Sequence, residues 1–140
     1  MHLDGYYFLP YLTVEAKTAP RHEIFYFSVD GDLTAMRYDE WKVIFLEHRF
    51  PQTLQAWAEP WTELRIPLLF NLRRDPYERA NITSNTYWDW YIDRAYLMLP
   101  AGAYTARFLA TFEEFPPRQK AGSFTIGDAK DKIFSAMGSK

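Results

Sequence analysis

The sequence predicts an α+β fold in which a four-stranded antiparallel meander is packed by C-terminal helices. Segments rich in aromatic and β-branched residues fill the first half of the chain, and short turns separate them. Helical periodicity replaces this pattern in the second half, and strands that precede helices indicate α+β rather than alternating α/β. At 140 residues we expect one domain, with an entry segment at 1–20, the sheet at 21–72, and a turn with helices at 73–140.

The entry segment is expected to form a short helix. Pro10 limits its regularity, and the residues from 13 to 20 are polar enough to form a loop. Four apolar residues would lie on one side of this helix: Leu3, Phe8, Leu9 and Leu12.

Three strands joined by tight turns are expected next, at residues 23–28, 33–38 and 41–47. The first turn contains Asp30 and Gly31, a strong hairpin signal, and the second contains Asp39 and Glu40. Adjacent strands with such short connections are antiparallel, so the segment predicts a meander.

Residues 48–67 are expected to form a long loop, with a short edge strand near 54–58, because three prolines interrupt them: Pro51, Pro60 and Pro67. Loops of this length inside a domain are usually functional or lie against another part of the protein. A fourth strand should occupy residues 68–72.

The strand at 68–72 runs into a polar turn that contains Asp75 and Pro76. Pro76 has no N–H to give to a sheet, so the strand should end before it. We expect Asp75 to cap the following turn, with Glu78 completing a reciprocal cap three positions later.

Helices should follow. Thr86 and Asp89 have capping-box spacing, and the next helix has one apolar face: Tyr87, Tyr91, Ala95 and Met98. Pro100 suits the first turn of another helix that runs to Glu114, where the residues from 115 to 117 stop it. A last short helix is expected within 124–137.

Composition excludes several classes of function. Lys and Arg number 16 against 18 Asp and Glu, so the net charge of −2 gives no electrostatic reason to expect a nucleic-acid partner. No apolar run is long enough for a membrane helix, and the first residues lack the pattern of a signal peptide. Cysteine is absent, which excludes disulfides and thiolate metal sites and leaves the cellular compartment unknown.

The chain resembles the C-terminal part of bacterial arylsulfatases in several separate blocks. Residues 68–81 are similar to the signature "LYNL-x-x-DP-x-E-x-x-N" of that part, and residues 20–47 to "PR-x-E-x-FYFSDDGDL-x-A-x-RY-x-x-WK-x-x-F". Residues 2–13, 57–100 and 112–124 are similar to further segments of the family. The resemblance implies a small antiparallel sheet with a packed helix, docked beside a larger α/β catalytic domain.

The chemistry of that family implies residues that this chain lacks. Its nucleophile is a formylglycine made from Cys or Ser in a C/S-x-P-x-R motif, and the nearest match here begins with Glu114, which cannot be converted. The family's calcium ligands belong to the catalytic domain. We therefore expect no catalytic residue, no metal site and no cofactor in this chain.

Six residues are candidates for a substrate rim or an interface: Arg49, Trp57, Trp61, Arg73, Arg74 and Trp88. By resemblance, the loop from Arg49 to Trp61 is the best candidate wall of a substrate entrance. Arg73 and Arg74 either clamp an anion or form surface salt bridges, and surface pairing is favoured. Trp88 belongs to an aromatic cluster at 87–91, whose rings lie on more than one side of the predicted helix. One buried helix face cannot hold all of them.

Other polar residues point to structure rather than chemistry. The histidines are far apart in the chain, which disfavours a zinc site: His2, His22 and His48. Asp30 and Asp32 supply too few oxygens for a calcium loop and fit a solvated hairpin tip.

The predicted role is that of a sulfatase C-terminal subdomain, structural and rim-forming, with the catalytic domain as its partner and no catalysis of its own. Two alternatives stay open. One is a stand-alone binding or assembly module that forms homo-oligomers. The other is an independent enzyme with a rearranged site around His48 and Arg49.

Overall fold

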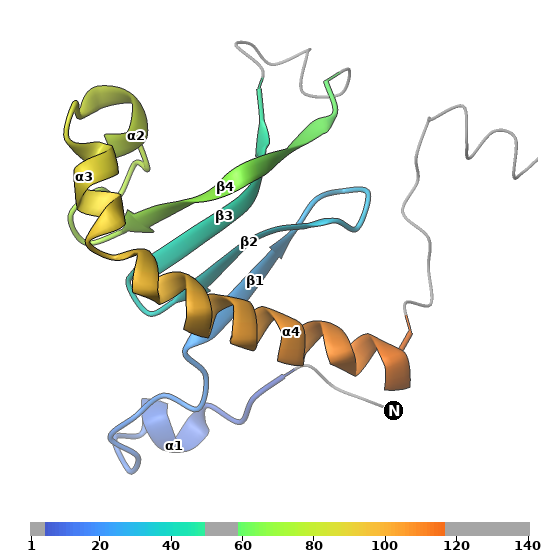
Figure 1. The fold of residues 1–140 in the computed structure, drawn as a ribbon. Coiled ribbons are helices and arrows are strands. Elements are labelled where there is room, and N and C mark those ends of the chain that lie inside the picture. The colour runs from blue at the N-terminus through green and yellow to red at the C-terminus, as the bar shows by residue number, and fades with distance from the viewer. Residues whose placement is uncertain (1–4, 50–58, 117–140) are drawn as a thin grey trace, which may run out of the picture.

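The computed structural model describes residues 5–49 and 59–116 and has the predicted α+β architecture (Figure 1). One antiparallel sheet has the strand order β1-β2-β3-β4, which confirms the meander. The strands are β1 (Glu23–Phe27), β2 (Leu33–Tyr38), β3 (Trp41–His48) and β4 (Trp61–Asn71). The helices are α1 (Leu9–Leu12), α2 (Ala80–Thr83), α3 (Tyr87–Ile92), the 3-10 helix η2 (Ala95–Leu97) and α4 (Met98–Glu114).

Three expectations of the sequence lie outside the described residues. They are the position of Leu3, the edge strand near 54–58 and the helix within 124–137. None of the helices in the two described ranges combines the length and the apolar character needed to cross a bilayer.

The β1–β2 hairpin turns where the sequence predicts it. Gly31 has a φ of 91°, a conformation that glycine adopts without steric cost. The Ser28 hydroxyl accepts hydrogen bonds from the backbone N–H groups of Asp30 and Asp32, both at 3.1 Å. Asp30 and Asp32 are exposed, as expected for a solvated tip.

Strand β4 is longer than predicted. It begins at Trp61 rather than at residue 68, so the expectation of a loop up to residue 67 is wrong there. The register explains how a strand tolerates Pro67: Ile44 pairs with Leu68 and Leu46 with Glu63, so the residues from 64 to 67 bulge opposite Phe45. Because β4 is at the edge of the sheet, Pro67 removes no hydrogen bond that a further strand would need.

One face of the sheet is covered by α4, which crosses the strands in Figure 1. A row of paired residues faces this helix: Phe25, Met36, Val43 and Leu69. The Phe25 ring stacks on Phe108 of α4 with centroids 4.0 Å apart, and the Thr105 hydroxyl lies 3.6 Å from the Met36 sulfur. This layer forms the hydrophobic core together with Phe70, Tyr87 and Tyr91.

The helical segment predicted from residue 87 to Glu114 is present, but it breaks in the middle. Tyr87 and Tyr91 are buried as expected, but α3 ends at Ile92, and η2 separates it from α4. Pro100 lies in the first turn of α4, which ends at Glu114 as expected.

Two predicted caps are wrong in detail. The Thr86 side chain caps no N–H of α3, because its hydroxyl lies 3.2 Å from the Ser84 hydroxyl instead. Asp75 does act as a cap, since its carboxylate accepts a hydrogen bond of 2.7 Å from the N–H of Ala80. Glu78 does not complete a reciprocal cap, because its carboxylate binds Lys42 of β3.

Candidate functional site

The structure separates the candidate residues into two groups at opposite ends of β4. Arg49 and Trp61 lie at the end of the β3–β4 hairpin, and Arg73, Arg74 and Trp88 follow the other end of β4. Trp57 lies outside the described residues. The five described residues therefore do not form one site.

At the hairpin end, Trp61 stacks on His48 with ring centroids 5.1 Å apart and planes 28° apart. The His48 Nε2 lies 2.6 Å from the backbone oxygen of Glu59 across the hairpin. The Arg49 guanidinium pairs with the Glu47 carboxylate. These contacts fix the two ends of the loop from Arg49 to Trp61, which is the predicted wall of the substrate entrance.

A hollow of about 420 Å³ opens beside this stack, on the sheet face opposite α4. Its lining is mostly apolar and includes Tyr26, Ala35 and Ile44, with His48 and Trp61 at one end. Among the described residues, Glu47 and His48 line it, whereas Arg49 is not part of its lining.

Among the described residues that line this hollow, there is no arginine and Lys42 is the one lysine. Its ammonium lies 2.7 and 2.8 Å from the two carboxylate oxygens of Glu78 and 4.9 Å from the centre of the Tyr26 ring. The side chains of Lys42 and Glu78 are 16% and 28% exposed, so this ion pair is partly shielded from water. Its charge is already balanced, which leaves Lys42 a structural rather than an anion-binding role.

Arg73 and Arg74 are exposed beyond the end of β4. Their backbone N–H groups donate to the Asn71 side chain at 3.2 and 3.3 Å, which fixes the turn. Within residues 5–49 and 59–116, neither guanidinium forms an ion pair.

The aromatic cluster at 87–91 divides into buried and exposed rings. Trp90 packs on Trp41 with ring centroids 6.0 Å apart, whereas Trp88 is 50% exposed and touches Tyr87 and Tyr91 edge-on. Three further apolar side chains are exposed along the same stretch of chain: Ile92 (70%), Tyr96 (65%) and Leu99 (79%). We refer to these three residues with Trp88 as the exposed stripe.

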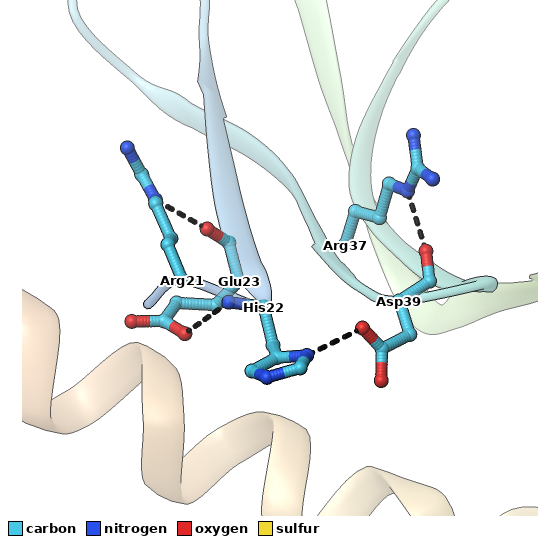
Figure 2. Close-up of polar contacts among 5 residues, drawn as sticks. All are labelled: Arg21, His22, Glu23, Arg37 and Asp39. Atoms are coloured by element: carbon cyan, nitrogen blue, oxygen red, sulfur yellow. Dashed lines mark hydrogen bonds and ion pairs between the residues drawn. The ribbon is translucent and has the colours of Figure 1, made fainter. Parts of the chain in front are cut away.

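A polar cluster joins the start of β1 to the β2–β3 turn (Figure 2). The His22 Nδ1 lies 2.8 Å from the Asp39 carboxylate, and the N–H of Asp39 donates to the backbone oxygen of His22 at 3.1 Å. Arg21 and Arg37 each donate from Nε to a backbone oxygen, of Glu23 and Asp39 respectively, at 2.6 Å. The histidine is thus hydrogen-bonded as expected, but its partner was not predictable from spacing.

No group of three or more metal-ligating side chains occurs among the residues that the structure describes. A family model for the C-terminal region of aryl-sulfatase matches residues 19–122, which contain the whole sheet, α2, α3 and α4. The chain belongs to this family.

The aryl-sulfatase C-terminal region seen here is also similar to part of the crystal structure of PsFucS1 sulfatase from Pseudoalteromonas sp.. The TM-score is 0.53 with 23% sequence identity, over 73% of this chain and 19% of that chain. At this identity the likeness concerns the fold, and the chain spans about a fifth of the length of that sulfatase. No curated protein sequence matches the chain.

Sequence reasoning missed the contact that joins the helices of this aryl-sulfatase C-terminal region to its sheet. The Tyr87 hydroxyl donates to the backbone oxygen of Leu69 and accepts from the N–H of Leu69, both at 3.0 Å. The hydroxyl therefore pairs with the backbone N–H and C=O of Leu69 at the edge of β4, where no further strand of the described residues pairs. Burial raises the pKa of the Tyr87 phenol, and the bond to Leu69 opposes part of that shift.

Proposed function

We propose that this chain is the structural C-terminal subdomain of an arylsulfatase-like sulfate-ester hydrolase, which packs against the catalytic domain and borders the entrance for the substrate. The supporting observation is that the two faces of its sheet are covered differently. One face is covered by α4, while the hairpin half of the other face keeps an apolar hollow of about 420 Å³ next to Trp61. A sheet face of this kind is normally buried against another layer.

The location of the hollow supports the role at the substrate rim. His48, Trp61 and the paired Arg49 mark the base of the segment from Arg49 to Trp61, which resemblance implies as a wall of the entrance. A tryptophan stacked on a histidine presents a flat apolar surface, which suits the aryl part of a sulfate ester. The proposal assigns these side chains to contact and shape, with no part in bond breaking.

The absence of catalysis is proposed from the sequence. No Cys or Ser stands in a C/S-x-P-x-R motif, so the chain has no precursor of a formylglycine. Hydrolysis of the ester would be done by residues of the catalytic domain, with calcium, as the family resemblance implies.

An assay of the 140-residue chain with 4-nitrophenyl sulfate and calcium tests this proposal. We expect no release of 4-nitrophenol above the rate in buffer, with an active arylsulfatase as the positive control. Turnover that scales with the concentration of the chain would overturn it. The triple variant Arg49→Ala, His48→Ala and His22→Ala would then show whether the activity belongs to these side chains or to a contaminant.

The exposed stripe favours a second candidate function, an assembly module that forms homo-oligomers. Trp88, Ile92, Tyr96 and Leu99 are each at least half exposed, and so many large exposed apolar side chains within one short stretch of chain favour an interface. Light scattering at several concentrations separates the two functions, because an assembly module must form a stable oligomer of defined mass. A constant monomer mass would exclude it.

A further inference from the structure

A second and larger cavity, of about 470 Å³, lies between the β2–β3 turn and the start of α4. It is on the sheet face opposite the hollow described above, so it does not belong to the proposed rim. Its floor is apolar and deeply buried, since Met36, Val43 and Leu69 are 2%, 4% and 0% exposed. Cavities of roughly 300–1,000 Å³ with apolar walls and a few polar groups are typical of small-molecule sites.

Aromatic rings form the sides of this cavity. Tyr38 and Tyr104 lie 5.1 Å apart between centroids, one from β2 and the other from α4, and Trp41 lies on the neighbouring strand. Rings have electron-rich faces that attract cations, and the attraction strengthens where water is excluded. The walls therefore suit a flat ligand that carries a positive charge.

The mouth carries two carboxylates, of Asp39 and Glu40. One Asp39 oxygen is bound to His22 at 2.8 Å. Within the described ranges, the other Asp39 oxygen and the Glu40 carboxylate have no hydrogen-bond or ion-pair partner. The lining contains no lysine or arginine, so the charged groups that line the cavity are these two carboxylates.

Figure 2 shows how the neighbouring arginines are oriented relative to the Asp39 carboxylate. The Asp39 carboxylate and the His22 ring lie on the side toward α4, whereas the guanidinium groups of Arg21 and Arg37 point away from the helix. Arg107 lies over the Tyr104 ring at 4.9 Å but does not line the cavity.

We propose that this cavity binds a small organic cation with a flat aromatic body. The body lies against the aromatic walls formed by Tyr38, Trp41 and Tyr104, and the charged nitrogen stays at the mouth beside Asp39 and Glu40. The inference does not rest on the proposed role as a sulfatase subdomain, because the two use opposite faces of the sheet.

Titration of the intact chain with benzyltrimethylammonium, followed by NMR, tests the proposal. We expect saturable shifts at the Trp41 indole N–H and at the rings of Tyr38 and Tyr104. Benzenesulfonate, which has the same ring and the opposite charge, should bind at least about tenfold more weakly in low salt. Equal affinity for the two probes would overturn the proposal, and so would the absence of saturable shifts.

Variants of the carboxylates test how much their charge contributes to binding of the cation. Asp39→Asn with Glu40→Gln should weaken binding of the cation about tenfold, and asparagine tolerates the positive φ of 48° at position 39. Glu113→Gln, which removes an exposed carboxylate of α4 that does not line the cavity, should leave the affinity within about twofold.

Ala101→Leu places a larger side chain in the cavity wall and should abolish the shifts while thermal melting shows a folded chain. If the double carboxylate variant fails to fold, Glu40→Gln alone can test the role of charge. The Glu40 side chain forms no hydrogen bond or ion pair within the described residues, so this substitution should not disturb the fold. Unchanged affinity in Glu40→Gln and Ala101→Leu would show that the cation binds elsewhere.

Discussion

At the residue scale, the chain depends on a few side chains that join segments distant in sequence. Tyr87 is the clearest case, because its hydroxyl bonds both backbone groups of Leu69, 18 positions earlier, at the edge of β4. Tyr87 is 2% exposed and Leu69 is 0% exposed, so water cannot replace these bonds.

We expect Tyr87→Phe to lower the free energy of unfolding by about 1–3 kcal/mol, because it leaves a buried N–H and a buried C=O without partners. Urea unfolding followed by circular dichroism measures the change. Tyr91→Phe is the matched control, since Tyr91 is also buried but its hydroxyl has no hydrogen-bond partner in the described residues, and it should change stability by less than about 0.5 kcal/mol. Equal effects of the two variants would contradict this role of Tyr87.

The same burial predicts how stability changes at alkaline pH. Burial raises the pKa of the Tyr87 and Tyr91 phenols above their ordinary value of 10.0. Above that pH the unfolded chain loses these protons while the folded chain keeps them, so the folded state binds more protons and its stability falls as pH rises. Below pH 10.0 this contribution is fully present.

Urea unfolding at several pH values from 8 to 11 checks this prediction, with Tyr91→Phe beside the parent chain. Removing the Tyr91 phenol should make the alkaline loss of stability less steep. An identical pH dependence in the two proteins would show that Tyr91 does not contribute.

Lys42 and Glu78 form the second long-range pair, 36 positions apart. Glu78 has a φ of 54°, a conformation that costs energy for a residue with a side chain, and the ion pair is one of the contacts that offset this cost. A double-mutant cycle with Lys42→Met and Glu78→Gln should give a coupling energy of about 1–2 kcal/mol, measured by chemical unfolding. Additive effects would mean that the pair contributes nothing beyond its separate side chains.

At the element scale, α4 is the helix that covers the sheet, and its phenylalanines form the contact. Phe108 stacks on Phe25 at 4.0 Å and touches Phe27 and Phe112 at 6.0 and 5.4 Å between centroids. The rest of the helix surface is largely exposed, so the attachment of α4 depends on a narrow apolar strip.

Phe108→Ala should therefore lower the free energy of unfolding by about 2–3 kcal/mol, less than the roughly 3–5 kcal/mol typical of a fully buried ring. Glu113→Ala, at an exposed position of the same helix, is the control and should change it by less than about 0.5 kcal/mol. Thermal or urea unfolding measures both. A loss below about 1 kcal/mol for Phe108→Ala would mean that other contacts hold α4.

At the scale of the whole molecule, the fold has apolar surface that its own described residues do not cover. The exposed stripe of Trp88, Ile92, Tyr96 and Leu99 lies along α3, η2 and the start of α4. In a subdomain this surface would be available to a larger partner, and in an assembly module to a second copy.

We expect the isolated chain to associate as its concentration rises, because the stripe favours burial. Ile92→Asp with Leu99→Asp should remove the association without unfolding the chain, since both side chains are more than two-thirds exposed. Sedimentation or light scattering gives the average mass, with Asp89→Asn and Asp93→Asn as a control pair nearby. Association that persists in the Ile92 and Leu99 variant would place the contact elsewhere.

The sequence by itself determined the elements whose signals are local. Asp30 and Gly31 mark the first hairpin, the strands with short turns give the meander, and Pro100 with the residues after Glu114 bounds α4. The motifs in several separate blocks also resemble those of the arylsulfatase family closely enough to suggest it. These features depend on neighbours within a few positions, so the order of residues specifies them.

Tertiary structure alone decided the rest, because those contacts join residues that no local pattern relates. The bulge opposite Phe45 let β4 extend through Pro67, and β3 presented Lys42 to Glu78, which removed the predicted reciprocal cap. Packing also placed the Tyr87 hydroxyl at the sheet edge and divided the candidate rim residues between the two ends of β4. Two side chains form a contact only if the fold brings them close together in space. That separation is set by the path of the folded backbone.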